Sequence, residues 1–284
     1  MIKILVTGGA GFIGSNLIKM LSKEKYKILS LDDYSSGNKE NEIENVTYIR
    51  GDISIIDQIN EEIDICFHLA AKSLVQESFK NVSDCFRVNV DGTLKVMEWA
   101  KNTNVKVLFA GSASRHNDPT ISPYALSKFI GEEICKLYRK NFSVDVEIAR
   151  FYNVYGPNER IDDKHSNVIG IWRSRLAKMH PLPIVGDGKQ KRDFIHVQDI
   201  ADGLIKLALS NKKNIDAWEL GTGIEYSINQ LYGFFKERFS NADYIRVEDQ
   251  PGNFRNSIRK NDQMTVELDW KPMDRLKDYI QNLD

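Results

Sequence analysis

The chain has 284 residues, a hydrophobic fraction of 42%, and 39 basic against 40 acidic side chains, so its formal net charge is −1. This balance gives no electrostatic reason to expect nucleic acid or an anionic membrane as a partner. The apolar runs are too short to span a membrane, and the first one lacks the cleavage site of a signal peptide. These features predict a cytoplasmic protein with a substantial core.

The first half of the chain alternates compact apolar runs with stretches of helical spacing. The apolar runs predict strands at Ile2–Val6, Tyr26–Leu31, Val46–Ile49, Ile63–His68, Val105–Ala110 and Val144–Ala149. Apolar residues at helical spacing predict helices at Phe12–Leu21, Phe86–Lys101 and Tyr124–Lys140. Such alternation predicts an α/β fold with a doubly wound parallel sheet of the Rossmann type, covered by helices on both faces.

A glycine-rich turn joins the first predicted strand to the first predicted helix. Gly8, Gly11 and Gly14 are spaced three apart, and glycine allows a tight turn whose backbone N–H groups approach a pyrophosphate. The helix N-terminus adds partial positive charge for that anion. Asp32 ends the second strand, where an acid can bond a ribose diol and repel a 2′-phosphate, and Asp33 adds to the repulsion. The combination predicts a site for NAD rather than NADP.

A tyrosine and a lysine lie one helical turn apart near the middle of the chain. Tyr124 and Lys128 are at i and i+4 on a predicted helix, so both point to one face. An ammonium near a phenol favours the phenolate, so we expect Lys128 to lower the pKa of Tyr124 toward working pH. Such a tyrosine can take a proton from a hydroxyl while hydride leaves the carbon for nicotinamide, and Lys128 can also hold the nicotinamide ribose. Ser112 follows a predicted strand at the sheet edge where ligands bind, and its hydroxyl can bond the reacting oxygen.

The pattern changes after about Arg150. Segments become shorter, and glycine and proline interrupt them more often. We expect residues 1–160 to form the NAD-binding domain and residues 161–284 to form mainly a smaller α/β substrate-binding lobe. A segment near 195–220, which includes a helix at Val197–Leu209, is expected to return to the first domain.

The motifs together resemble the extended short-chain dehydrogenase/reductase family, in its nucleotide-sugar epimerase/dehydratase branch (UDP-glucose 4-epimerase-like). The resemblance runs along nearly the whole chain. It rests on stretches similar to TGGxGFIG, NVxGT, SPYxxSK, RxxNVYGP, GDGxxxRDF and LGWxP, which here are Thr7–Gly14, Asn89–Thr93, Ser122–Lys128, Arg150–Pro157, Gly186–Phe194 and Leu268–Pro272. The joint order of these motifs is far more specific than any one of them.

The resemblance implies further contacts and an assembly. Beyond the glycines, the aspartates, Tyr124 and Lys128, it implies NAD contacts from Phe12, Ile13, Asp52, Ile53, Leu69, Ala70, Ala71, Asn89 and Tyr152. It implies that a nucleotide-diphosphate sugar contacts Ser112, Asn153, Val168, Arg192 and Arg255. It also implies a homodimer or a higher homo-oligomer, formed through a bundle of the Phe86–Lys101 and Tyr124–Lys140 helices.

The chain departs from the family pattern after Ser112. The VYG that normally follows is absent, so the wall of the sugar pocket is expected to differ. Dehydratases of the family carry Asp-Glu after the Ser or Thr, and decarboxylases carry a Glu; Ala113 and Ser114 cannot move protons in that way, so both activities are disfavoured. His116 in this loop is either a substituted acid/base or, as we favour, a solvated histidine. An arginine usually found before a late PGD-like turn is also missing, and Arg255 is a candidate to replace it at the diphosphate.

The sequence therefore predicts NAD-dependent oxidation and reduction at C4 of a nucleotide sugar, by a 4-epimerase or a 4-dehydrogenase. Two alternatives are a non-catalytic NAD-binding regulator of the same fold and a reductase of a keto-sugar. Cys66, Cys85 and Cys135 are odd in number and widely spaced, which predicts reduced, buried thiols. No CxxC or Cys/His cluster is present, so no metal site is predicted.

Overall fold

A seven-stranded sheet lies at the centre of the protein. The computed structural model describes residues 1–163 and 166–284. The strand order is β10-β6-β5-β4-β1-β2-β3, and every neighbouring pair is parallel. In chain order these strands are β1 (Lys3–Thr7), β2 (Lys27–Asp32), β3 (Thr47–Arg50), β4 (Ile65–His68), β5 (Lys106–Ser112), β6 (Val146–Phe151) and β10 (Trp218–Leu220). The order reverses between β1 and β4, which confirms the predicted doubly wound Rossmann-type sheet.

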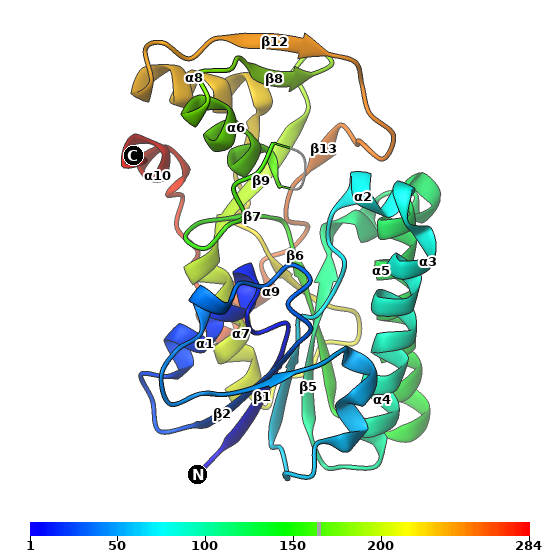
Figure 1. Ribbon diagram of the computed structural model, residues 1–284. Coiled ribbons are helices and arrows are strands. Elements are labelled where there is room, and N and C mark those ends of the chain that lie inside the picture. The colour runs from blue at the N-terminus through cyan, green and yellow to red at the C-terminus, as the bar shows by residue number, and fades with distance from the viewer. Residues whose placement is uncertain (164–165) are drawn as a thin grey trace.

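Helices cover both faces of this sheet (Figure 1). One face carries α1 (Phe12–Leu21), α7 (Val197–Leu209) and α9 (Gln263–Leu268); the other carries α4 (Gly92–Lys101) and α5 (Pro123–Phe142). Successive strand residues point to opposite faces, so Ile4 and Val6 join one buried cluster while Leu5 joins the other. Two cores on one sheet explain why the strands have continuous apolar sequences.

The helix predicted at Phe86–Lys101 is longer and less regular than its sequence indicated. It begins with α3 (Val82–Phe86), passes through a π-helical turn at Arg87–Asp91 and continues as α4. Asn89 lies in the π turn, and its amide donates to the hydroxyl of Ser127 on α5 at 2.9 Å. Apolar spacing did not reveal this turn, and the side-chain bonds of Asn89 within it go to residues distant in sequence.

The remaining elements form a smaller lobe beyond the carboxyl ends of the large sheet's strands. β9 (Lys191–His196) pairs with β7 (Asn153–Tyr155), β11 (Glu225–Ser227) and β13 (Asn256–Ser257), while β8 (Leu182–Val185) pairs with β12 (Tyr244–Val247). The helices are α6 (Val168–Ala177), α8 (Ile228–Arg238) and α10 (Leu276–Gln281), and their core contains Trp172, Leu231 and Phe235. α7 packs on α1 and β10 extends the large sheet, so the chain does cross back. The domain division at residue 160 stays a prediction.

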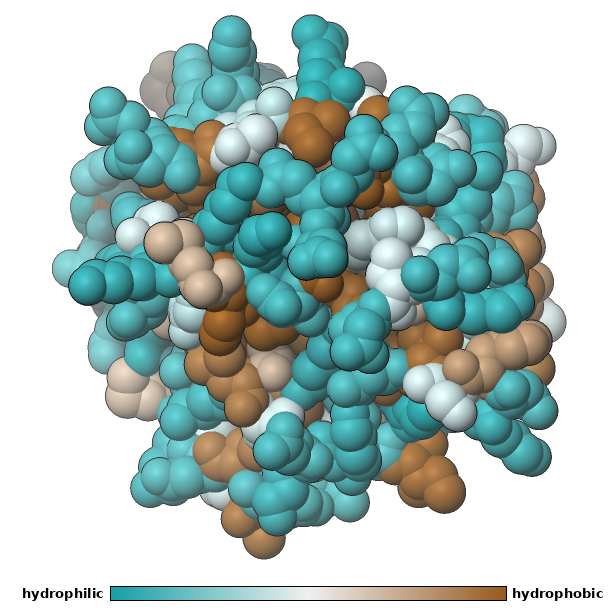
Figure 2. Space-filling model, turned by 90° about the horizontal axis from the view of Figure 1, so that it is seen from below, coloured by the Kyte–Doolittle hydropathy of each residue, from teal (hydrophilic) through white to brown (hydrophobic). Residues whose placement is uncertain are grey.

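The surface is mixed in polarity. Figure 2 shows the end that carries the amino ends of the large sheet's strands, where hydrophilic side chains separate small apolar patches. Within the part of the chain that the structure describes, no helix combines the length and apolar character needed to cross a membrane.

Cys66, Cys85 and Cys135 are free and buried, as predicted. α2 (Val75–Lys80) packs on α5 near the cleft described next.

Candidate active site

A cleft separates the carboxyl edge of the large sheet from the smaller lobe. Its main cavity has a volume of about 340 Å³ and is lined from the β1–α1 turn, β2, the segment after β4, β5 and α5. A second cavity of about 260 Å³ extends into the smaller lobe. The two share Asn153, Asn167 and Phe254 as lining residues, so they form one continuous cleft. In open α/β sheets this edge, where the strand order reverses, is where ligands bind.

The glycine turn can accommodate a pyrophosphate. Gly8 has a φ of +74°, and a side chain on Gly14 would put its Cβ 2.2 Å from the Gly8 carbonyl oxygen. Gly11 precedes α1 without any side-chain cap, and the first helical turn contains no acidic residue. No side chain therefore competes with an anion for the free N–H groups at the amino end of α1, which lies at the edge of the cavity.

The acid at the end of β2 is held in the same cavity. Asp32 accepts hydrogen bonds from the backbone N–H of Ala10 at 2.9 Å and of Tyr34 at 2.7 Å, one on each oxygen. Burial raises the pKa of Asp32, and these N–H donors oppose that rise. Each carboxylate oxygen keeps a lone pair that can accept from a ribose hydroxyl. Asp33 also lines the cavity, so the residues present fit the dinucleotide that the sequence predicts.

The other predicted cofactor residues gather around this cavity with one exception. Those that line it are Phe12, Ile13, Asp52, Ile53, Leu69, Ala70, Ala71 and Tyr152. Asn89 does not line it. Its side chain instead accepts from the Lys72 N–H at 2.8 Å and donates to the Lys72 carbonyl at 2.9 Å. Lys72 lines the cavity, so Asn89 contributes to the site indirectly, by holding the backbone of Lys72 in place.

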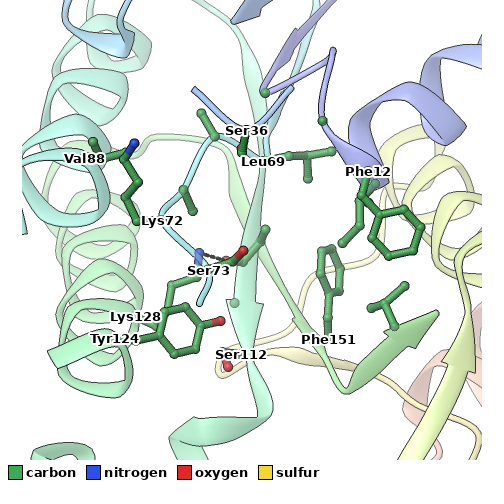
Figure 3. A pocket seen from close by; sticks show the side chains of 18 of the residues that line it. Phe12, Ser36, Leu69, Lys72, Ser73, Val88, Ser112, Tyr124, Lys128 and Phe151 are labelled. Atoms are coloured by element: carbon green, nitrogen blue, oxygen red, sulfur yellow. Dashed lines mark hydrogen bonds between the residues drawn. The ribbon is translucent and has the colours of Figure 1, made fainter. Parts of the chain in front are cut away.

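Tyr124, Lys128 and Ser112 point into the cavity from one side (Figure 3). The first turn of α5 is set by Pro123 and by Ser122, whose hydroxyl accepts from the Ala125 N–H at 3.1 Å. This start directs Tyr124 and Lys128 toward the end of β5, where Ser112 lines the same cavity. The structure therefore brings together the three residues predicted to carry the chemistry.

The ionisation of this group differs from the sequence-based expectation. Burial raises the pKa of Tyr124, and the nearby Ser112 hydroxyl offsets that rise only in part. Lys128 Nζ donates to the Ala110 carbonyl at 2.7 Å, and burial lowers the pKa of Lys128 to about 8. The expectation that Lys128 lowers the Tyr124 pKa is wrong for the protein alone, because desolvation of the phenol is the larger effect.

The predicted substrate residues divide into two groups. Asn153, Val168 and Arg192 line the second cavity. The Arg192 guanidinium donates to the neutral oxygens of Lys191 at 2.8 Å and Asn253 at 2.6 Å, and burial lowers its pKa to about 10. Arg255 lines neither cavity; it pairs with Asp187 at 2.9 Å, and its side chain is 70% exposed. The structure thus brings one of the two predicted arginines to the cleft.

The loop that lacks VYG is anchored outside the cleft. His116 Nε2 lies 2.9 Å from an oxygen of buried Glu219, whose other oxygen accepts from the Tyr152 hydroxyl at 2.5 Å. Burial opposes ionisation of Glu219, but hydrogen bonds from His116, Tyr152 and Arg150 outweigh it and hold its pKa below the ordinary value. His116 is therefore neither a solvated loop residue nor a group aimed into the cavity.

Sequence reasoning missed several residues of the cleft. Further lining residues include Ser35, Ser36, Lys72, Ser73, Phe151, Asn253 and Phe254. Lys72 and Ser73 follow directly on Ala71, so the motif that identified Leu69 to Ala71 could have been extended to them. Phe254 and Asn253 carry no comparable local signal, because a long return of the chain brings them to the cleft.

Comparisons with known proteins agree with this geometry. The sequence profile of the NAD dependent epimerase/dehydratase family matches residues 4–221. A Methanocaldococcus jannaschii protein named "Putative UDP-glucose 4-epimerase" is 33% identical, with 99% of this chain and 96% of that protein covered. UDP-glucuronic acid decarboxylase 1 of Arabidopsis thaliana is 27% identical, with 99% and 69% covered. The crystal structure of UDP-glucuronic acid 4-epimerase from Bacillus cereus, in complex with UDP-glucuronic acid and NAD, has a TM-score of 0.90 at 27% identity, with 99% and 97% covered. This chain belongs to the NAD dependent epimerase/dehydratase family, as its motifs predicted, and NAD is the cofactor of that family.

Proposed function

We propose that this protein oxidises the C4 hydroxyl of a nucleotide-diphosphate sugar, as a 4-epimerase or a 4-dehydrogenase. The observation that carries the proposal is that Ser112, Tyr124 and Lys128 line the same cavity as the glycine turn and Asp32. A phenol beside a dinucleotide site is suited to removing a proton from an alcohol as hydride leaves its carbon.

Tyr124, Ser112 and Lys128 have different roles in the proposed reaction. Tyr124 takes the proton of the C4 hydroxyl, and Ser112 bonds the same sugar oxygen. Lys128, whose ammonium already donates to Ala110, has further N–H donors for the nicotinamide ribose. When bound, NAD supplies the hydride acceptor and a positively charged nicotinamide ring that favours the phenolate of Tyr124. Re-reduction on the opposite face of the ketone yields the 4-epimer, and release of the ketone makes the enzyme a 4-dehydrogenase.

The residues of the second cavity support the proposal that the substrate carries a nucleotide diphosphate, which would bind there. Arg192 there is a half-buried cation whose hydrogen bonds go to neutral oxygens, and its guanidinium also lies 4.5 Å from the centre of the Phe254 ring. The planar guanidinium group can donate two parallel hydrogen bonds to two oxygens of one phosphate. Asn153, at the junction of the two cavities, is placed to bond the phosphate nearer the sugar.

Dehydration and decarboxylation are disfavoured, although a relative of this chain is named a decarboxylase. Both reactions in this family use an acidic side chain just after the position of Ser112, and here Ala113 and Ser114 occupy that stretch. The imidazole of His116 in the same loop is a candidate to replace that acid. It hydrogen-bonds Glu219, however, and does not line the cavity. The loop therefore supplies no acid/base group for chemistry next to C4.

Product mass separates these reactions in one experiment. The protein is incubated with UDP-, GDP-, CDP- and dTDP-linked hexoses and hexuronic acids in the presence of NAD, and the products are analysed by mass spectrometry and chromatography. We expect a product of unchanged mass but altered retention for an epimerase, or one that has lost two hydrogens for a 4-dehydrogenase. Loss of water or of carbon dioxide would contradict the proposal, as would the absence of any conversion across the four nucleotide series.

We also propose that the protein is a homodimer formed through α4 and α5. Large apolar side chains are exposed on these helices and on α2 and α3 beside them: Phe79, Val82, Leu94, Leu137 and Phe142, each between 40% and 51% exposed. Several large apolar side chains exposed on neighbouring helices are typical of an interface between protein chains. A symmetric pairing of two copies would bury it as a four-helix bundle.

Sedimentation equilibrium tests this dimer. Wild type is expected at twice the chain mass of 32.6 kDa, and Leu137→Glu, which puts a charge into the interface, is expected at 32.6 kDa. Val266→Glu is the matched control, because Val266 is 80% exposed and belongs to α9, on the face of the sheet opposite α4 and α5. A wild type that stays at the single-chain mass, or a Leu137→Glu protein that remains dimeric, would contradict the interface.

The three free, buried thiols support the predicted cytoplasmic location. Cys66, Cys85 and Cys135 form no disulfide. Unpaired cysteines are typical of reducing compartments, whereas exported proteins tend to pair theirs. A nucleotide-sugar substrate is consistent with the same location.

A further inference from the structure

Asn253 is a polar side chain in the second cavity to which the proposed chemistry assigns no role. It lies in the turn between β12 and β13, which reaches across the cleft to α2, where the Gln76 amide donates to the Pro251 carbonyl at 2.9 Å (Figure 1). Gly252 in the same turn has a φ of +81°, and a Cβ there would lie 2.7 Å from a methyl carbon of Val75. These contacts hold the turn, and Asn253 with it, against the cavity.

The Asn253 side chain bonds a cation on one side and an acid on the other. Its Oδ1 accepts from Arg192 Nη2 at 2.6 Å, and its Nδ2 donates to Asp249 Oδ1 at 2.8 Å. Only this orientation of the amide satisfies both neighbours, because a guanidinium can only donate and a carboxylate can only accept. An uncharged group therefore lies between Arg192 and the exposed Asp249.

The other contacts of Arg192 are also with neutral groups. Its Nη1 donates to the carbonyls of Lys191 at 2.8 Å and Arg255 at 3.5 Å, and its guanidinium carbon lies 4.5 Å from the centre of the Phe254 ring. A guanidinium has five N–H groups. Among the described residues, these bonds leave the Nε–H and one N–H of Nη2 for a ligand, and a phosphate can accept from both.

We propose that Asn253 is a positioning residue that sets the affinity of Arg192 for the diphosphate of the substrate. This inference rests on the proposed function, in which Arg192 bonds that diphosphate. The amide holds the guanidinium by a neutral oxygen and keeps the Asp249 carboxylate one side chain away, so the positive charge of Arg192 stays available to a phosphate. A carboxylate in direct contact with Arg192 would instead form the strong charged hydrogen bonds that a phosphate makes.

Asn253→Asp changes the charge at this position and almost nothing of its shape. The new carboxylate would replace the amide oxygen that lies 2.6 Å from Arg192 Nη2 and would pair with the guanidinium. A diphosphate must then compete with an anion of the protein for the same N–H groups, and it also approaches a second negative charge. Charges this close, near a protein surface, change a binding constant by tenfold or more.

Asn229 provides a matched control on the same lobe. Its Oδ1 also accepts from an arginine, Arg246 Nη2 at 3.2 Å, while its Nδ2 donates to the Asp187 carbonyl at 3.0 Å. Asn229 lines neither cavity. Asn229→Asp therefore makes the same change of charge beside an arginine, but outside the cleft.

The test measures the binding of UDP, GDP, CDP and dTDP by isothermal titration calorimetry, with NAD at saturation so that the cofactor site is filled. For the diphosphate that wild type binds most tightly, we expect the dissociation constant to rise about ten- to hundredfold in Asn253→Asp and to stay within about twofold in Asn229→Asp. The matching nucleoside, followed by NMR titration, should bind all three proteins equally because it carries no phosphate. With the nucleotide sugar, KM should rise in Asn253→Asp while kcat stays within about twofold, as for a loss of uniform binding.

The outcomes separate this inference from the proposed function. Equal affinity of wild type and Asn253→Asp for the diphosphate, or an equal loss for the nucleoside, would overturn the role of Asn253, as would a wild type that binds none of the four diphosphates. Binding without conversion of any nucleotide sugar would count against the C4 chemistry alone, because the calorimetry would still decide the role of Asn253. Asn253→Ala serves if the aspartate variant does not fold. It removes the bond that holds Arg192 and should weaken diphosphate binding about three- to tenfold, again with no effect on the nucleoside.

Discussion

Replacing Tyr124 by phenylalanine is expected to lower kcat by about a thousandfold, with little effect on ligand affinity. General acid–base groups contribute about 10²- to 10⁴-fold to rate, and Tyr124 lines the cavity together with Ser112 and Lys128. The phenylalanine ring keeps the packing of Tyr124 on α5, so the cavity should retain its shape. Steady-state kinetics on the nucleotide sugar identified by product analysis measures the loss.

Ligand binding by Tyr124→Phe and the activity of a control variant test whether the loss is due to the Tyr124 hydroxyl. A ligand at about 100 times its dissociation constant adds about 2.7 kcal/mol to stability, so NAD and the nucleotide sugar should raise the melting temperatures of wild type and Tyr124→Phe alike. Tyr138→Phe removes another hydroxyl from α5, one that bonds Glu98 outside the cavity, and should leave kcat unchanged. Full activity in Tyr124→Phe would exclude the phenol as the base and would favour another reading of the site.

Replacing Arg150 by methionine is expected to destabilise the fold by about 3–5 kcal/mol. Arg150 is 2% exposed and bonds buried Glu132 at 2.8 Å, buried Glu219 at 3.1 Å and Asp216 at 2.8 Å. Removing one partner of a buried ion pair leaves a charge that neither water nor protein compensates, which costs about this much. Urea denaturation at neutral pH measures the difference. The exposed Arg255–Asp187 pair is the control, because Arg255→Met should change stability by less than about 1 kcal/mol.

The loss in Arg150→Met should depend on pH with a defined sign. In wild type the pKa of Glu219 is below its ordinary value, so its contribution to stability is complete above that value and is lost only in acid. Without Arg150, burial dominates and raises the carboxyl pKa values, so the folded variant binds more protons than the unfolded chain near neutrality. The stability of the variant should therefore rise as pH falls from neutral toward mildly acidic, where wild type changes little. Adding Glu132→Gln and Glu219→Gln should recover part of the loss and remove this pH dependence; a variant as stable as wild type across the range would contradict the argument.

The buried ion network also connects the altered loop to the cavity. Glu132 accepts from the Ser112 N–H at 3.4 Å, and Glu219 accepts from Tyr152, which lines the cavity. His116 completes the network from the loop side by bonding Glu219. Arg115, which pairs with Glu133, and His116, which bonds Glu219, thus hold the stretch that lacks VYG, while Ala113 and Ser114 at its start line the cavity.

The sequence alone determined the features that lie within one short stretch of chain. The glycine spacing before α1, the acid that ends β2 and the four-residue interval between Tyr124 and Lys128 are local, and backbone geometry turns each into a fixed arrangement. The alternation of apolar runs and helices was enough for the doubly wound sheet and for its ligand-binding edge. The predicted family followed from the order of such local motifs.

Tertiary structure decided whatever depends on partners distant in sequence. It brought Arg192 to the cleft but paired Arg255 with Asp187, and it turned His116 toward Glu219, a residue 103 positions away. It also reversed the expected direction of the Tyr124 pKa, because the cost of desolvating a phenol depends on everything packed around it. Short motifs fix which groups are available, whereas burial and long-range contacts fix their direction and charge.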